Sequence, residues 1–180
     1  MKVKDIVNFW FADECRTCWF NATNEIDKMI RERFEPIWED ARDNKLKSWM
    51  DTAEGCLALV IILDQFPLNM YRGQAESFST EASARSVARH AIEQGFDQGM
   101  SREEKTFLYL PFMHSENIED QNESIALFER AGMTDNLKWA MHHRDIVRSF
   151  GRFPHRNNIL GRVNSPEEDA YLRSDAAFLG

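Results

Sequence analysis

Residues 56–66, CLALVIILDQF, form the most apolar stretch of the chain, and Pro67 follows directly. The eight apolar residues CLALVIIL fall far short of the roughly 20 that a membrane-spanning helix needs, so the stretch predicts a helix buried in a protein core. Proline lacks an amide donor and disfavours helical geometry at the preceding residue, so this helix is expected to end just before Pro67. Asp51 and Glu54 resemble a capping pair ahead of it.

Helix signals continue on both sides of this stretch. Apolar residues recur at spacings of three and four from Ile26 to Ala41, which indicates one apolar stripe on a helix. Asn24 with Asp27 is expected to start that helix, and Pro36 to bend it. Further helices are expected over residues 80–94, 101–113, 116–131 and 135–150, and from residue 165 onward.

Capping residues and glycines mark where these later helices begin and end. Ser101 with Glu104, and Ser165 with Glu168, match the S-x-x-E capping box, in which side chain and backbone groups satisfy each other. Three helices are followed directly by a glycine that can adopt the left-handed conformation of a helix end, namely Gly95, Gly132 and Gly151.

The predicted fold is all-α. Alternating strand patterns and hairpin turns do not appear in the sequence, and 13 phenylalanines with five tryptophans are typical of a packed globular protein. The helix signals predict about seven to nine helices, arranged as stacked antiparallel pairs. A length of 180 residues, without a linker, predicts a single helical domain over residues 1–180.

Positive charge is concentrated in one part of an acidic chain. The formal net charge is −8, yet residues 142–162 carry five arginines against the single acidic residue Asp145, a balance of +4. A basic patch in an acidic surround favours a small anion such as a phosphate or carboxylate, and the net charge of −8 opposes nucleic acid at long range. In the other interpretation, the arginines pair with carboxylates of the helical array. The five are Arg144, Arg148, Arg152, Arg156 and Arg162.

Three short segments place histidines beside acidic groups or arginines. His114 precedes Glu116, His143 precedes Asp145, and His155 lies in the basic stretch. If helix pairs stack, these segments can converge and supply a general base or metal ligands. No H-E-x-x-H or comparable spacing is present, so no metal site is predicted.

Two proline-containing corners resemble each other. FPLN with Arg72 echoes FPHRN with Arg162, and both follow predicted helices. They are interpreted either as structural corners, whose Asn and Arg side chains bind freed carbonyls, or as walls of a polar cleft. Asp64 ends the apolar helix, where the helix dipole disfavours a carboxylate, so an arginine of the basic stretch is its expected partner.

The strings DIVNFWF, LDQFPLNMYRG, FLYLPFMHSENIEDQ, HRDIVRSFGRFPHRN and NILGR resemble the bacterial family called domain of unknown function 924. The resemblance covers nearly the whole chain. It implies an all-α, tetratricopeptide-like right-handed array of helix pairs, although the repeat code of about 34 residues is not readable. The motif positions are Asp64, Gln65, Asn69, Arg72, His114, Glu116, His143, Asp145, Arg152, His155, Arg156 and Asn157.

Two functions remain open. The first is a basic, histidine-bearing cleft that binds a small anionic ligand or an acidic partner segment. The alternative is a hydrolase or transferase that acts on a phosphorylated or carboxylated small molecule. There His143 or His155 would act as acid/base, with Glu116 as a third candidate catalytic group. The expected ligand-binding residues are Asp64, Gln65, Asn69, Arg72, His114, Asp145, Arg152, Arg156, Asn157 and Arg162.

The cysteines and the N-terminus indicate the cellular compartment of the protein. The three cysteines, Cys15, Cys18 and Cys56, cannot all pair within the chain, which favours free thiols in a reducing compartment. The C-R-T-C spacing lacks the context of a zinc or thioredoxin-like site, so no function is assigned to it. The N-terminus lacks the pattern of a signal peptide, and a cytoplasmic protein without cofactor, nucleic-acid partner or membrane contact is expected.

Overall fold

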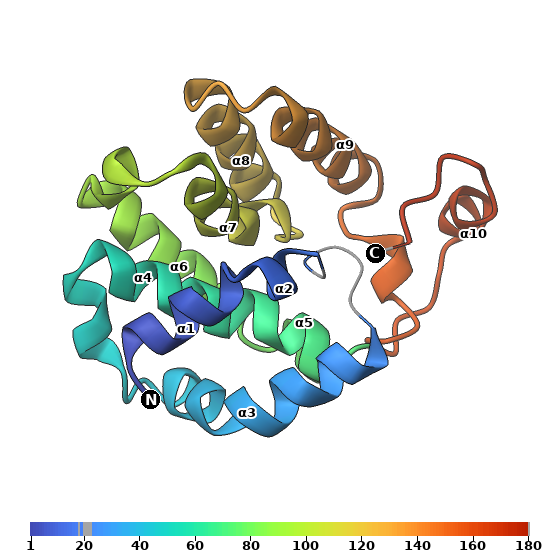
Figure 1. Ribbon diagram of the computed structural model, residues 1–180. Helices are drawn as coiled ribbons and strands as arrows, with labels where there is room; N and C mark the ends of the chain where they lie inside the picture. The colour runs from blue at the N-terminus through green and yellow to red at the C-terminus, as the bar shows by residue number, and fades with distance from the viewer. Residues whose placement is uncertain (18, 20–22, 180) are drawn as a thin grey trace. The chain divides into compact units, whose positions relative to one another are not determined.

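A computed structural model describes residues 1–17, 19 and 23–179 of the chain, and all regular secondary structure in this part is helical (Figure 1). If the continuous segment 53–70 is counted once, nine α-helical segments are present among these residues, within the predicted range. The all-α class is therefore confirmed.

The chain forms two compact units. The N-terminal unit comprises Met1–Arg72 and Glu76–Pro111, and the C-terminal unit comprises Gly73–Ala75 and Phe112–Gly180. The single domain over residues 1–180 stays a prediction. The N-terminal unit contains α1 (Val3–Trp10), α2 (Asp13–Arg16), α3 (Asn24–Arg42), η1 (Lys47–Asp51), α4 (Ala53–Val60), η2 (Ile61–Gln65), α5 (Phe66–Met70), η3 (Ala75–Phe78, shared at its first residue), α6 (Glu81–Glu93), η4 (Phe96–Gly99) and α7 (Arg102–Met113), whose last two residues belong to the other unit.

The apolar stretch is a buried helix, but the prediction that it ends before Pro67 is wrong. α4, the π-helical turn η2 and α5 run on without a break to Met70. Pro67 has no amide to offer the Leu63 carbonyl, which would be its partner four residues earlier. The Thr80 hydroxyl donates to that carbonyl instead, at 2.6 Å, so the helix passes the proline without leaving a buried acceptor unsatisfied.

Two predicted helix starts are shifted by one residue. Thr23, not Asn24, caps α3, because its hydroxyl accepts from the Ile26 amide at 3.4 Å. Thr52 caps α4 by accepting from the Gly55 amide at 3.1 Å, in place of the expected Asp51 pair.

The capping box at the start of α7 is confirmed. The Ser101 amide donates to a Glu104 carboxylate oxygen at 2.7 Å, and the Glu104 amide donates to the Ser101 hydroxyl at 3.3 Å. Pro111 lies inside this helix, near its end at Met113.

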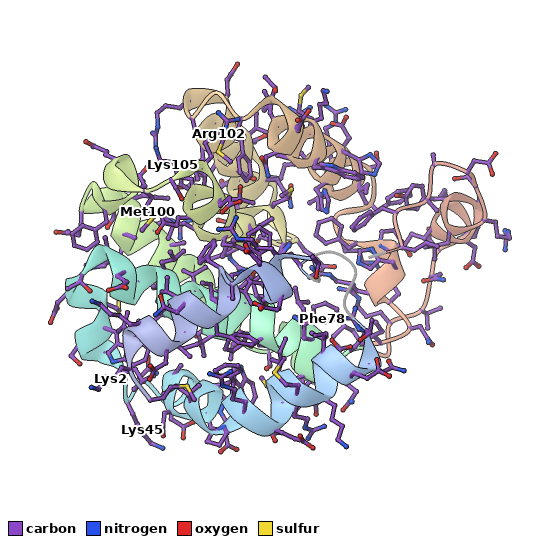
Figure 2. All side chains as sticks on the ribbon, viewed as in Figure 1. Lys2, Lys45, Phe78, Met100, Arg102 and Lys105 are labelled. Atoms are coloured by element: carbon purple, nitrogen blue, oxygen red, sulfur yellow. The ribbon has the colours of Figure 1, made fainter. Side chains whose placement is uncertain are left out.

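Aromatic rings make the centre of the N-terminal unit. Trp10 of α1 packs edge-on against Phe66 of α5, with ring centroids 5.7 Å apart, and against Phe107 of α7 at 5.4 Å. All three side chains are at most 1% exposed. Figure 2 shows the side chains filling the space between these helices, while charged residues such as Lys2 and Lys45 point outward.

The segment Ala53–Met70 has the length and composition of a membrane span, yet 83% of it is buried inside the protein. Its side chains pack on α1, α3 and α6 instead of facing outward. The burial matches the core helix predicted from the sequence.

The C-terminal unit contains α8 (Ile118–Arg130), α9 (Thr134–Phe150), η5 (Pro154–Arg156) and α10 (Pro166–Leu172). α8 and α9 pack side by side as a helical hairpin (Figure 1). Gly132 and Gly151 take positive φ values of 64° and 70° at the helix ends, as predicted. The buried core of the unit includes Ile146, Val147 and Phe153.

Candidate functional site

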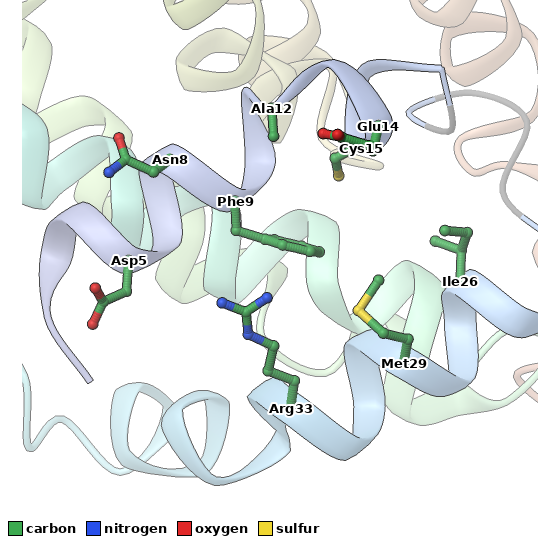
Figure 3. Close-up of a pocket in the computed structure, with 9 residues that line it drawn as sticks. All are labelled: Asp5, Asn8, Phe9, Ala12, Glu14, Cys15, Ile26, Met29 and Arg33. Atoms are coloured by element: carbon green, nitrogen blue, oxygen red, sulfur yellow. The ribbon is translucent and has the colours of Figure 1, made fainter.

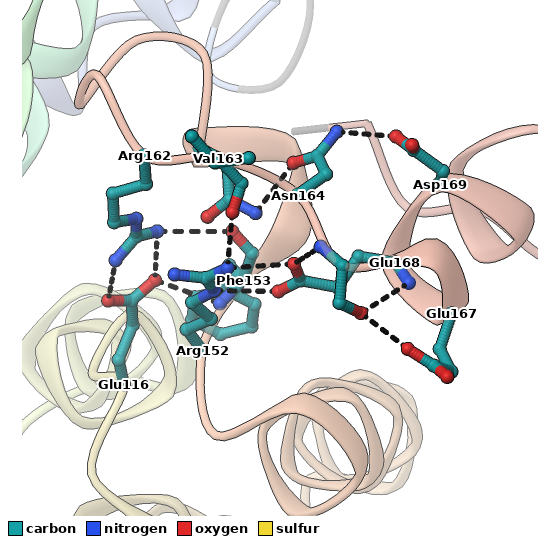
Figure 4. Close-up of polar contacts among 11 residues, drawn as sticks. Glu116, Arg152, Phe153, Arg162, Val163, Asn164, Glu167, Glu168 and Asp169 are labelled. Carbon is teal, nitrogen blue, oxygen red and sulfur yellow. Dashed lines mark hydrogen bonds and ion pairs between the residues drawn. The ribbon is translucent and has the colours of Figure 1, made fainter.

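Arg152 and Glu168 form a two-pronged ion pair in the C-terminal unit (Figure 4). Nε and Nη2 of Arg152 donate to the two Glu168 oxygens at 2.6 and 2.7 Å, and Nη2 also donates to the Val163 carbonyl at 2.9 Å. Glu168 closes the predicted capping box by accepting from the Ser165 amide at 2.7 Å. The same carboxylate therefore fixes the start of α10 and holds the arginine that follows α9.

Arg162 and Glu116 form a second pair of the same kind (Figure 4). The two terminal nitrogens of Arg162 donate to the two Glu116 oxygens at 2.7 and 2.8 Å. Glu116 also accepts from the Phe153 amide at 2.8 Å. This carboxylate thus connects the start of the α8 region with the proline corner after α9.

These contacts change the acidity of both carboxyl groups. The bond from Arg152 lowers the pKa of Glu168 to about 2, and the Ser165 amide adds to the effect. Burial raises the pKa of Glu116, but the bonds from Arg162 and Phe153 outweigh it and leave the pKa lowered. Both carboxyls are ionised at neutral pH, so the charges of Arg152 and Arg162 are already neutralised in this structure.

Two predicted histidines come together around two phenylalanine rings. The His143 ring of α9 lies 5.6 Å from Phe153 and 4.6 Å from Phe178, measured between centroids. His155 of η5 lies 5.6 and 5.1 Å from the same two rings. The predicted meeting of these two segments is therefore present in the structure.

Two more histidines belong to this group. His142 packs edge-on against His143 at 6.1 Å, and the charge of His114 acts on both His143 and His155. We call His114, His142, His143 and His155 the histidine cluster.

The two central imidazoles are neutral at neutral pH. Burial lowers the pKa of His143 to about 4, and the Trp139 carbonyl opposes this while the other three histidines add to it. Burial likewise lowers the pKa of His155 to about 4. Arg156, Arg162 and His114 add to this effect, and Glu116 opposes it. Around His155, two arginines therefore act against one carboxylate.

The ring nitrogens of these two histidines differ in their partners. Nδ1 of His143 lies 2.8 Å from the Trp139 carbonyl, which fixes the hydrogen on that nitrogen and leaves Nε2 as an acceptor. Nδ1 of His155 is buried and has no hydrogen-bond partner among the described residues. Arg156 lies with its guanidinium 4.8 Å above the Phe153 ring and is 6% exposed.

Other predicted residues of this unit have local roles. Asp145 pairs with Arg144 at 2.9 Å and Arg148 at 3.2 Å on the surface of α9. The fully buried Asn157 donates to the Asn164 side chain at 2.7 Å. Within the part of the chain that the structure describes, no three His, Cys, Asp or Glu residues are arranged to hold a metal ion.

The remaining predicted residues form a polar chain in the N-terminal unit. The Gln65 amide donates to the Asp64 carboxylate, and the Asn69 amide donates to the Gln65 carbonyl at 3.0 Å. Arg72 donates to Asn69 at 3.4 Å and to Asp27 at 2.7 and 3.0 Å. An ion pair of Asp64 with an arginine of the basic stretch stays a prediction.

Cys15 and Cys56 are buried, and Cys56 is a free thiol, as expected. Cys18, the second cysteine of the C-R-T-C segment, lies outside the described residues. Burial raises the pKa of Cys56 to about 11, so this thiol stays protonated.

Sequence analysis missed two aromatic side chains of the cluster. Phe178 contacts His142, His143 and His155, but it lies in the last residues of the chain, where no periodic pattern marks it. Trp139 stands next to His142 and His143 and is 56% exposed. The spacing of three and four residues along a helix was the available signal for Trp139.

Fold and site together define an all-helical protein whose C-terminal unit contains a histidine cluster and two arginine–carboxylate pairs. The chain belongs to the family described as bacterial protein of unknown function (DUF924), whose model matches residues 6–176. It is similar in structure to a protein of unknown function, ATU0120, from Agrobacterium tumefaciens, with a TM-score of 0.90 and 42% identity. The similarity covers 95% of this chain and 96% of that one. No curated protein matches the sequence.

Proposed function

We propose that the histidine cluster of the C-terminal unit binds a small anion that carries oxygen acceptors, such as a phosphate or a carboxylate. The observation that carries the proposal is the packing of His143 and His155 around the same two phenylalanine rings. Buried imidazole nitrogens in proteins are normally hydrogen-bonded, and the bare Nδ1 of His155 is an exception that a ligand oxygen would satisfy.

The charges near His155 favour an anion over a cation. Arg156 and Arg162 both act on this imidazole, and one carboxylate, Glu116, opposes them. Glu116 is already bound by Arg162 through two hydrogen bonds. The guanidinium of Arg156 lies on the face of Phe153, the ring against which His143 and His155 pack, so its positive charge is close to the cluster.

Binding of an anion at this place requires proton uptake. A neutral imidazole offers one N–H donor, whereas a protonated one offers two and adds a positive charge. An anion that contacts His155 or His143 therefore raises the pKa of the imidazole from about 4 toward its ordinary value. Affinity is expected to rise as the pH falls from about 7 toward 5.

The test is calorimetric titration with inorganic phosphate at several pH values, in two buffers of different ionisation enthalpy. The wild type should bind phosphate with net proton uptake, and His155→Gln should lose at least about tenfold in affinity. His90→Gln is the control, since His90 lies on α6 in the N-terminal unit. Equal phosphate affinity in His155→Gln and wild type would remove the cluster as the binding site.

The same titration separates the possible sources of the anion. Inorganic phosphate, acetate and a glutamate-rich peptide each supply acceptor oxygens, in a free ion or in a chain. A peptide that binds more tightly than either free ion would assign the site to an acidic partner segment.

The enzymatic alternative is favoured by one observation, the fixed tautomer of His143. Its Nδ1 contact to the Trp139 carbonyl leaves Nε2 as an oriented acceptor, the arrangement of a general base. A pKa of about 4 makes this a weak base at neutral pH, so binding is the preferred function. A screen of phosphate esters with wild type and His143→Ala tests the alternative, and turnover that is unchanged in the variant would exclude His143 from the reaction.

A further inference from the structure

The N-terminal unit contains a separate surface cavity of about 430 Å³ between α1, α2 and α3 (Figure 3). Its volume lies in the range of roughly 300–1,000 Å³ that is typical of small-molecule sites. Five apolar residues line it, namely Phe9, Ala12, Cys15, Ile26 and Met29. Its polar groups are Asp5, Asn8, Glu14 and Arg33.

A rigid aromatic layer lies beneath this cavity. The Phe9 ring lies 4.6 Å from Phe34 and 6.2 Å from Phe66, and Phe34 stacks on Phe66 at 4.7 Å. Phe34 and Phe66 are fully buried, so they hold Phe9 in place while part of its ring stays accessible. The cavity therefore presents preformed apolar surface to a ligand.

Arg33 is the cation at the edge of this layer. Its guanidinium carbon lies 5.0 Å from the Phe9 ring centroid and 4.9 Å from that of Phe34. No carboxylate within the described part of the chain lies at ion-pair distance from Arg33. A guanidinium stacked on rings keeps the N–H donors in its own plane, where a carboxylate can bind them in two-pronged fashion.

Two carboxylates lie on the rim of the cavity, and they belong to other helices than Arg33 does. Asp5 accepts from the Lys2 amide at 2.7 Å at the start of α1, and Glu14 lies on α2. In Figure 3 the Arg33 guanidinium lies beside the Phe9 ring, and Asp5 and Glu14 extend from other helices. Arg33 is therefore the one cation among the described residues that line the cavity.

We propose that this cavity binds a small amphipathic carboxylate, with the carboxylate head on Arg33 and the apolar body on Phe9 and Met29. The proposal is independent of the histidine cluster, which belongs to the other unit. Its ligand differs in kind, because the cluster offers polar contacts and the cavity offers apolar area as well.

The test compares octanoate, octylammonium and octanol by calorimetric titration. Arg33→Gln should weaken octanoate binding about tenfold or more and leave octanol binding unchanged, because only the charged contact is removed. Arg31→Gln is the matched control. Arg31 is exposed on the same helix, two residues away, and its charge is already paired with Glu35 at 3.1 Å.

A second variant tests the apolar part of the cavity. Met29→Trp places a larger side chain in the cavity and should reduce binding of both octanoate and octanol, with thermal unfolding as the check that the fold is kept. His155→Gln should bind octanoate as the wild type does, so the failure of one proposal does not affect the other. Absent octanoate binding, octylammonium binding tighter than octanoate, or an unaffected Arg33→Gln variant would each overturn the proposal.

Discussion

Arg162 binds Glu116 through two hydrogen bonds of 2.7 and 2.8 Å, across 46 residues of sequence. The side chains are 23% and 26% exposed, so most of the pair is shielded from water. Since Glu116 also holds the Phe153 amide, the carboxylate fixes the position of the ring on which His143 and His155 pack.

Glu116→Gln is expected to destabilise the protein by about 3 kcal/mol, because it leaves the Arg162 charge partly buried without a counter-charge. Urea unfolding at neutral pH measures the loss. Glu129→Gln is the control, because Glu129 is exposed at the end of α8. A variant as stable as this control would mean that the pair contributes nothing net.

Glu168→Gln tests the second pair through its pH dependence. Glutamine keeps the capping box with Ser165, so the substitution removes mainly the charge that faces Arg152. Because the folded pKa is about 2, against an ordinary 4.5, the stabilisation is complete above 4.5 and is lost as the pH falls toward 2. The difference in unfolding free energy between wild type and variant should therefore shrink over that window. A difference that is constant with pH would contradict the depressed pKa.

The buried histidines predict a second pH dependence of stability, which arises from protonation of the unfolded chain. Between pH 4, near the folded pKa of both groups, and pH 6.5, the ordinary pKa, His143 and His155 are protonated in the unfolded chain but neutral in the folded one. Stability therefore rises with pH through this window, by up to about 1.4 kcal/mol per pH unit for each histidine, and levels off above it. In His143→Asn, the slope of the unfolding free energy against pH should be smaller by the contribution of one histidine. Urea unfolding at several pH values in this range measures it. An unchanged slope would show that His143 titrates normally.

Thr80→Val tests the bridge over the proline. Valine keeps the branched shape but removes the donor to the Leu63 carbonyl and the acceptor of the Trp38 indole N–H, which lies at 3.2 Å. The buried carbonyl is then unsatisfied, and a loss of about 2 kcal/mol in unfolding free energy is expected. Ser79→Ala is the neighbouring control, because its exposed hydroxyl bonds only to the nearby Glu76 carbonyl. Equal stability of the two variants would argue against the bridge.

Gly55 lies where α4 meets η1. A Cβ atom at this position would clash with the Trp49 carbonyl oxygen, and the backbone would have to move. Gly55→Ala is therefore expected to lower the free energy of unfolding by about 2 kcal/mol or more, although alanine normally favours a helix. Gly99→Ala has open space around the added atom and should be close to neutral. Thermal unfolding of both variants compares them directly.

Local chemistry made much of the fold predictable. The capping boxes at Ser101 and Ser165 and the helix ends at Gly132 and Gly151 depend on residues within a few positions of each other. The shift from Asp51 to Thr52 is small because both side chains can cap a helix. The passage through Pro67 was not predictable, since the rescuing hydroxyl of Thr80 comes from another helix segment.

The site was predictable in composition but not in pairing. Charge clustering and histidine positions identified His143, His155 and the arginines as residues to examine. The pairing of each carboxylate with its arginine depends on where α10 and the α8 region pack in the folded chain. The sequence contains no local signal for this packing. Glu168 was therefore predicted as a cap and not as the partner of Arg152.

The π-helical turn at Ile61–Gln65 also sets the phase of everything after it in that helix. Such a turn holds one residue more than an α-helical turn, and removal of one residue would rotate α5 by about 100° about its axis. Phe66 would then leave Phe9 and Phe34, and Arg72, which follows α5, would leave Asp27 of α3. The length of this segment is consequently as constrained as its composition, and deletions within it should be far less tolerated than conservative replacements.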